Sequence, residues 1–368
     1  LIDIGRLLQA TAATTQLTLS VYLAGFAVSQ IVYGPLSDRF GRKPLLFAGL
    51  AVYVAAAATA SFAPSLQVLI LVRFVWGLGA AAPRSIAIAM VRDSYDGEHM
   101  ARTMSLVMAT FISVPVIAPT VGAGVIAIFG WRSIFWFQFT LAALLATWAA
   151  LRLPETLPAE RRRTVSPRSL VDAFVTVVRN RESLGYGLSV LCLFGVLSSY
   201  IASSEIIIDK VFDHKDAFPV LFGVLAVVMG AGSLLNARLV TRYGLHRFVK
   251  GVVLAACVGT GLFALVAVLT DGKPPFVVFM FLTALVLLGN SMLVPNANTA
   301  AMLPVGHVAG MAAAVLGAAG TGGGSILGGI VGASFDGTVR PFAIGSFVCT
   351  ALAAVCMHVV AKPSPSRA

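Results

Sequence analysis

The chain has 368 residues, of which 58% are hydrophobic and 11% are charged, whereas a soluble domain carries about a quarter charged residues. This composition excludes an ordinary soluble protein and indicates an integral protein of the lipid bilayer. The formal net charge of +11 does not indicate nucleic-acid binding, because the cations lie in short loops between apolar segments and form no single basic stripe.

Eleven apolar segments are long enough to cross a membrane, because a spanning helix needs about 20 residues. They predict an all-α polytopic membrane protein with spans at residues 16–37, 44–63, 66–91, 100–129, 133–153, 183–208, 217–238, 248–269, 275–302, 308–334 and 341–361.

The loops between these segments differ in charge. Of the 26 lysines and arginines, 18 lie on one side of the predicted membrane and six on the other, and Arg73 and Arg84 lie inside a span. Since basic loops stay in the cytoplasm, we expect a multi-pass protein of the cell membrane, the inner membrane in a bacterium, with a cytoplasmic C-terminus.

The loop between the first two spans is the most distinctive stretch, and we call residues 34–43 the charged turn. Its sequence pattern is G-x-x-x-D-R-x-G-R-K, in which glycine permits a tight reversal and the cations hold the loop at the cytoplasmic surface. We expect it to act as a gating latch between two halves of the protein, through Gly34, Asp38, Arg39, Gly41, Arg42 and Lys43.

Part of the charged turn recurs 203 residues later as Thr241-Arg242-Tyr243-Gly244, which indicates two parallel repeats. The expected domains are an N-terminal bundle at 1–153, a polar cytoplasmic linker at 154–182 with the character of an amphipathic surface segment, and a C-terminal bundle at 183–368. The offset places the counterpart of span 183–208 upstream of Leu1, so we expect the first helix of the N-terminal bundle to be missing from this chain.

The charged turn resembles the signature of the major facilitator superfamily of secondary transporters. Residues 73–81 resemble the R-x-x-Q-G-x-G-A-A pattern of that superfamily, with Trp76 in place of glutamine, and residues 118–124 resemble the A-P-x-x-G-G element of its drug/proton antiporters. Residues 306–310 and 334–338 are similar to late elements of the twelve-helix Bcr/CflA-like group. The resemblance implies two six-helix bundles that work by alternating access.

Five polar residues inside spans are candidates for proton coupling or for lining a cavity, because polar groups in a membrane interior usually serve a function. Arg73 and Arg84 share one face of a helix at an 11-residue spacing, and the others are Gln30, Glu205 and Asn290. The resemblance implies that the acidic partner of Arg73 lies on the missing helix. Pro115, Pro119 and Gly122 are expected to let their helix bend during transport.

The favoured interpretation is proton-coupled export of small amphipathic or hydrophobic compounds, driven by the proton gradient without a cofactor. We expect no enzyme and no metal site, because the four cysteines lack metal-ligand spacing and neither a phosphate-binding lysine motif nor a nucleophile–base pair is present. The expected partners are a small-molecule substrate, protons and the lipid bilayer, without nucleic acid, and we expect a monomer. Two alternatives stay open, a proton-coupled transporter of a specific metabolite such as a sugar or an amino acid, and a membrane sensor or scaffold that does not transport.

Overall fold

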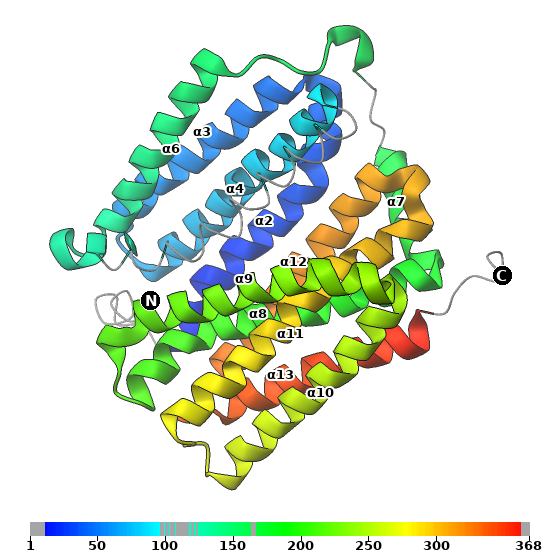
Figure 1. Ribbon diagram of the computed structural model, residues 1–368. Coiled ribbons are helices and arrows are strands. Elements are labelled where there is room, and N and C mark those ends of the chain that lie inside the picture. Colours follow the sequence, from blue (N-terminus) through cyan, green and yellow to red (C-terminus); the bar gives the residue numbers. More distant parts are fainter. Residues whose placement is uncertain are drawn as a thin grey trace. The chain divides into compact units, whose positions relative to one another are not determined.

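The computed structural model describes residues 12–95, 99, 103, 107, 118, 121–122, 124–162 and 167–361. Its regular elements are helices throughout the described residues (Figure 1). Ten of these helices are long and apolar enough to cross a membrane. Their ends agree with ten of the predicted spans to within a few residues, while most of the predicted span 100–129 lies outside the described residues.

The described chain forms two compact units, residues 1–173 and 174–368. The border between them falls inside the predicted linker, within helix α7 (Pro167–Arg179). The first unit holds α2 (Ala12–Phe40), α3 (Arg42–Ser61), α4 (Leu66–Ser94), α6 (Ser133–Arg152) and the short η1 (Ala159–Arg161). The second unit holds α8 (Arg181–Lys210), η2 (Lys215–Ala217), α9 (Phe218–Tyr243), α10 (Leu245–Leu269), α11 (Phe276–Met302), η3 (Leu303–Val308), α12 (Ala309–Ala333), α13 (Arg340–Val355) and η4 (Cys356–Val360).

In the first unit, α4 packs against both α2 and α3, and α6 packs on α3. Two glycines of α4 permit these close contacts. A Cβ atom on Gly77 would collide with the backbone carbonyl of Tyr22 in α2, and one on Gly79 would lie 2.5 Å from the backbone nitrogen of Tyr53 in α3. The glycines of residues 73–81 therefore set how near α4 comes to its neighbours, and they fix the position of Arg73 one turn earlier.

In the second unit, α8 is the central helix and packs against α11, α12 and α13. Its contact with α12 depends on the glycine run of that helix. A Cβ on Gly324 would lie 2.5 Å from Cβ of Phe194, and one on Gly328 would lie 2.8 Å from the backbone nitrogen of Ser199. The glycine run thus provides close helix packing, as expected for small residues in a membrane bundle.

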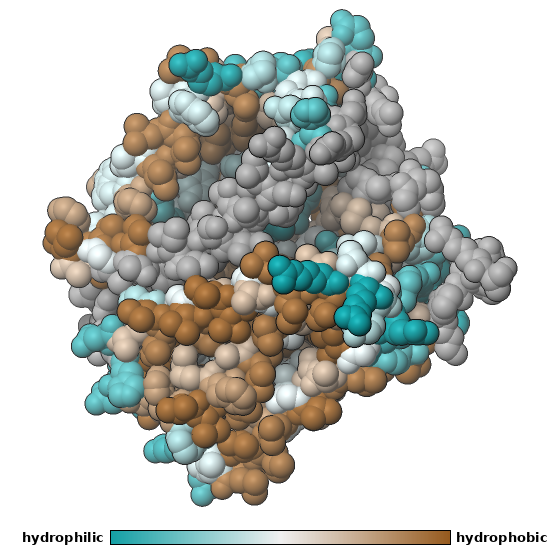
Figure 2. Space-filling view, viewed as in Figure 1, coloured by the Kyte–Doolittle hydropathy of each residue, from teal (hydrophilic) through white to brown (hydrophobic). Residues whose placement is uncertain are grey.

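The outward side chains of α9, α10 and α11 are strongly apolar, as the brown areas over these helices in Figure 2 show. They include the exposed residues Val220, Val227, Leu234, Leu254, Val258, Leu265, Val277 and Phe281. Exposed apolar faces of this extent belong in hydrocarbon, so these helices present lipid-facing surfaces.

Candidate functional site

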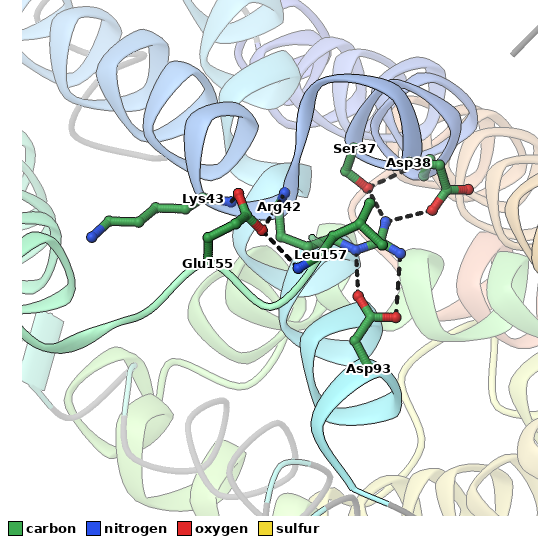
Figure 3. A network of polar contacts seen from close by, with 8 residues as sticks. Ser37, Asp38, Arg42, Lys43, Asp93, Glu155 and Leu157 are labelled. Carbon is green, nitrogen blue, oxygen red and sulfur yellow. Dashed lines mark hydrogen bonds and ion pairs between the residues drawn. The ribbon is translucent and has the colours of Figure 1, made fainter. Parts of the chain in front are cut away.

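Arg42 is the centre of a polar network at the end of the first unit (Figure 3). Its side chain is 3% exposed, and its Nε lies 2.7 Å from Oδ2 of Asp93 while Nη1 lies 2.6 Å from Oδ1 of Asp38. Nη1 also donates to Oγ of Ser37. The fork of one arginine, with its five donors, therefore joins the end of α2, the start of α3 and the last turn of α4.

Glu155 completes this network from the loop after α6. Its carboxylate accepts hydrogen bonds from the backbone N–H groups of Arg42 at 3.0 Å and Lys43 at 3.1 Å, which open α3. The first turn of a helix has N–H groups without intrahelical partners and a partial positive charge. Glu155 satisfies two of those donors and places a negative charge where the helix favours one.

The same contacts change the acidity of Glu155. Burial would raise the pKa of its carboxyl group, but hydrogen bonds from the backbone N–H groups of Leu157, Arg42, Lys43 and Thr156 hold that pKa below the usual value. The carboxylate therefore stays ionised at neutral pH and below. The side chain of Lys43 extends toward α6, where Nζ donates to the carbonyl oxygen of Ala150 at 3.2 Å.

Gly41 allows Glu155 to approach. Its φ of 101° and ψ of 155° lie in a region essentially reserved for glycine. A Cβ at this position would lie 2.6 Å from Oε2 of Glu155. The backbone reversal and the lack of space for a Cβ atom therefore both explain the glycine predicted at this position of the charged turn. By contrast, a Cβ on Gly34 would meet nothing within 4 Å, and nothing in the structure explains a glycine there.

The charged turn and its repeat share their local geometry. Arg39 lies over the neighbouring Phe40 ring at 5.1 Å from the centroid, and Arg242 lies over Tyr243 at 5.7 Å. The next residue in each copy, Gly41 or Gly244, has positive φ and separates two helices. The sequence repeat is therefore also a structural one at this turn.

The two copies differ in their polar contacts. In the second unit, Nδ2 of Asn296 donates to Oδ1 of Asn236 at 2.5 Å, and both side chains are buried. Asn296 lies 203 residues after Asp93, so a neutral amide stands where the first copy has a carboxylate, while its partner Asn236 corresponds to Tyr33 and not to Arg42. This contact joins α9 to α11.

Arg73 lies in an aromatic cage, which we define as Tyr22, Trp76 and Phe135. The Cζ atom of Arg73 lies 5.0 Å from the centroid of the Trp76 ring, 5.4 Å from that of Phe135 and 6.0 Å from that of Tyr22. Trp76 and Phe135 are fully buried. Their π faces attract the cation, and such contacts strengthen away from water.

Within the described residues, no carboxylate lies in ion-pair contact with Arg73, and its buried Nε has no hydrogen-bond partner. Where the superfamily pattern has glutamine, Trp76 presents an aromatic ring to Arg73.

The other predicted site residues lie in separate places. Gln30 is half-buried in α2 and Arg84 is exposed in α4, while Glu205 in α8 and Asn290 in α11 belong to the second unit. Nε2 of Gln30 and both amide atoms of the buried Asn290 lack partners among the described residues. Their roles in a cavity or in coupling stay predictions.

Of the three residues expected to bend a helix, Pro115 and Pro119 lie outside the described residues. Gly122 is half-buried, and a Cβ there would lie 3.7 Å from Cδ1 of Ile134, an ordinary contact. Packing within the described residues therefore does not require glycine at position 122.

Two acids of the network, Asp93 and Glu155, were not among the predicted site residues. Asp93 is the acid at the end of the apolar span that contains Arg73. Glu155 is the first acid after Arg152, which lies at the end of the predicted span 133–153. Neither position indicates by itself that the two carboxylates meet Arg42.

Residues 1–333 match the sequence profile of the Major Facilitator Superfamily. The chain belongs to this superfamily. It is therefore a multi-pass membrane transporter and not an enzyme, and transporters of this kind are generally driven by ion gradients without a cofactor.

Two relatives and one solved structure illustrate the match. A bicyclomycin resistance protein homolog of Haemophilus influenzae is 26% identical over 97% of this chain and 89% of its own length. The multidrug resistance protein MdtL of Escherichia coli is 27% identical over 85% of this chain and 77% of its own length. The crystal structure of a D-xylose-proton symporter superposes with a TM-score of 0.78 at 14% identity, over 95% of this chain and 88% of that one, which supports the fold alone.

Proposed function

We propose that this transporter exports small amphipathic or hydrophobic compounds in exchange for protons, by alternating access between an N-terminal and a C-terminal bundle. The observation that carries the proposal is the aromatic cage around Arg73. The relatives named for bicyclomycin resistance and multidrug resistance support the same class of compound.

The cage combines two properties that such a transporter needs. The half-buried Tyr22 ring offers apolar surface with a polar edge, which suits amphipathic compounds, and the buried Trp76 and Phe135 rings hold the cation beside it. A buried guanidinium requires a negative or polar partner, and an acid that loses its charge on protonation ceases to be one. A change in pairing at Arg73 would therefore favour one conformer over another, which is the differential affinity that coupling requires.

The remaining assignments follow from this proposal. The bundles are residues 1–153 and 183–368, joined by the cytoplasmic linker 154–182, and the network around Arg42 latches the cytoplasmic end. Arg84, Gln30, Glu205 and Asn290 face the transport path. The protein works as a monomer in the cell membrane, the inner membrane of a bacterium, with its C-terminus in the cytoplasm and the proton gradient as its energy source.

Proteoliposomes that contain a pH-sensitive dye test the proposal, with bicyclomycin, ethidium, D-xylose and an amino acid as candidate substrates. We expect proton movement with bicyclomycin or ethidium. Proton movement with D-xylose or the amino acid alone would instead favour a metabolite transporter, and the absence of movement with every compound would favour a sensor or scaffold.

Variants of Arg73 then test the role of the aromatic cage, on which the proposal rests. Arg73→Ala should abolish substrate-driven proton movement, and Arg73→Lys should retain part of it, because lysine keeps the charge but loses the planar fork. Lys273→Ala, an exposed loop residue, is the control. Undiminished flux in a correctly inserted Arg73→Ala variant would contradict the role of the cage.

A further inference from the structure

Helix α7 leads directly into a membrane span. It ends at Arg179, only Asn180 intervenes, and α8 begins at Arg181 (Figure 1). Asn180 caps α8, because its Oδ1 accepts the backbone N–H of Ser183 at 2.9 Å. With one residue between the two helices, α7 cannot move far from the end of α8, so it lies at the level of the membrane surface.

The apolar residues of α7 form one stripe along the helix. Val171, Phe174 and Val178 recur at the spacing of three and four residues that places side chains on one face. Val177, at one edge of this stripe, is 3% exposed and belongs to the buried cluster of the second unit that includes Tyr186 and Val305. One edge of the stripe therefore anchors α7 to the second unit.

The rest of the stripe is uncovered. Val171 is 59% exposed, Phe174 is 53% exposed and Val178 is 40% exposed. Asp172 and Thr176 occupy the opposite side of the helix in the same register. This is the pattern of a helix that lies in a membrane interface with its apolar face inserted into the lipid.

The charges around α7 indicate which class of lipid headgroup it would bind. Residues 160–181 contain six arginines and two acids. Arg168 and Arg179 are 11 residues apart, which is three helical turns, so they occupy nearly the same angular position on the helix, just beyond the apolar stripe. Arg162 and Arg181, which flank α7 in the sequence, are exposed. Arginines in this position pair with anionic headgroups while the apolar side chains enter the acyl region.

We propose that α7 is an interfacial membrane anchor that binds the anionic phospholipid headgroups of the cytoplasmic leaflet. Phe174, Val171 and Val178 insert between the lipids, and the arginines around them bind the phosphate groups. This inference rests on the proposed cytoplasmic position of the linker and does not depend on which compound the protein transports.

Spin-label accessibility in nanodiscs tests the proposal on the full chain. A label on Phe174→Cys should collide more with dissolved oxygen than with a water-soluble nickel chelate, whereas a label on Asp172→Cys should show the reverse. The unmodified chain is the labelling control, because its four cysteines are buried or half-buried. Accessibility of Phe174→Cys to nickel equal to that of Asp172→Cys would place the stripe in water, and protection from both reagents would place it under protein. Either result would overturn the proposal.

A change of lipid composition tests whether α7 prefers anionic headgroups. In nanodiscs with phosphatidylglycerol, the label at position 174 should be immersed more deeply than in phosphatidylcholine alone, and high salt should weaken the difference. The double variant Arg179→Gln and Arg181→Gln should shift the docked population by about fivefold for each charge removed. Equal immersion in both lipids would overturn the preference for anionic headgroups, and an unchanged thermal unfolding temperature of the double variant would show that the protein remains folded.

Discussion

Arg42 and Asp93 lie 51 residues apart in the sequence, and Nε of Arg42 lies 2.7 Å from Oδ2 of Asp93. The contact joins the first residue of α3 to the last turn of α4. Because the Arg42 side chain is nearly inaccessible to water, its charge depends on these protein partners.

Asp93→Asn should destabilise the protein more than Asp38→Asn does. The Asp93 side chain is 16% exposed and that of Asp38 is 39% exposed, so water replaces the lost contact more readily at Asp38. Loss of a hydrogen bond to a charged group is worth about 2 kcal/mol, which we expect for Asp93→Asn. Thermal unfolding of the single and double variants in nanodiscs measures both values, and a larger effect of Asp38→Asn would contradict this ordering.

Glu155→Gln should remove a pH-dependent part of the stability. The folded-state pKa of Glu155 is held below its ordinary value of 4.5, so its ionised form stabilises the folded protein above that pH. This contribution is lost as the pH falls from 4.5 through the lower folded-state pKa. The difference in unfolding temperature between the wild type and Glu155→Gln should therefore shrink on acidification. Glu160→Gln, which removes an exposed acid of the same segment, is the matched control for the loss of one charge.

Gly41→Ala should destabilise the protein more than Gly244→Ala. Both glycines have positive φ, which opposes any other residue by about 1–3 kcal/mol. Only at Gly41 does the new methyl group also meet a neighbour, the carboxylate of Glu155. Gly34→Ala, where the methyl group meets nothing within 4 Å, should be nearly neutral. Unfolding temperatures of the three variants give the comparison, and equal losses for Gly41→Ala and Gly244→Ala would exclude a contribution from the Glu155 contact.

Trp76→Leu should impair transport more than Trp76→Phe. Phenylalanine keeps a π face near Arg73, whereas leucine keeps only apolar volume. Both replacements leave space in a buried site, so each should lower stability by a few kcal/mol. Proton flux at matched protein levels, read beside unfolding temperatures, separates the two effects. Similar flux in both variants would indicate that Trp76 serves only for packing.

The sequence predicts the helices well because membrane spans are defined by apolarity and length, which are local properties. Asp38 and Arg42, which form an ion pair, both belong to the charged turn singled out in the sequence and are four positions apart. The contact of Glu155 with the backbone of Arg42 spans 113 residues. It depends on how α6 packs on α3, which no local pattern contains. The aromatic cage could not be predicted for the same reason, because Phe135 contacts Arg73 from another helix.

The repeated turn has a consequence for how the two copies should respond to substitution. Gly41 and Gly244 reverse the chain in the same way, and an arginine lies over the preceding aromatic ring in both copies. Arg42 and Asp93 carry full charges, whereas Asn236 and Asn296 carry none. The backbone reversal is thus common to both copies, while the contact of Asn296 is neutral and that of Asp93 is ionic. An added side chain at either glycine should therefore strain the reversal in the same way, whereas removing the charge of Asp93 has no equivalent at the neutral Asn296.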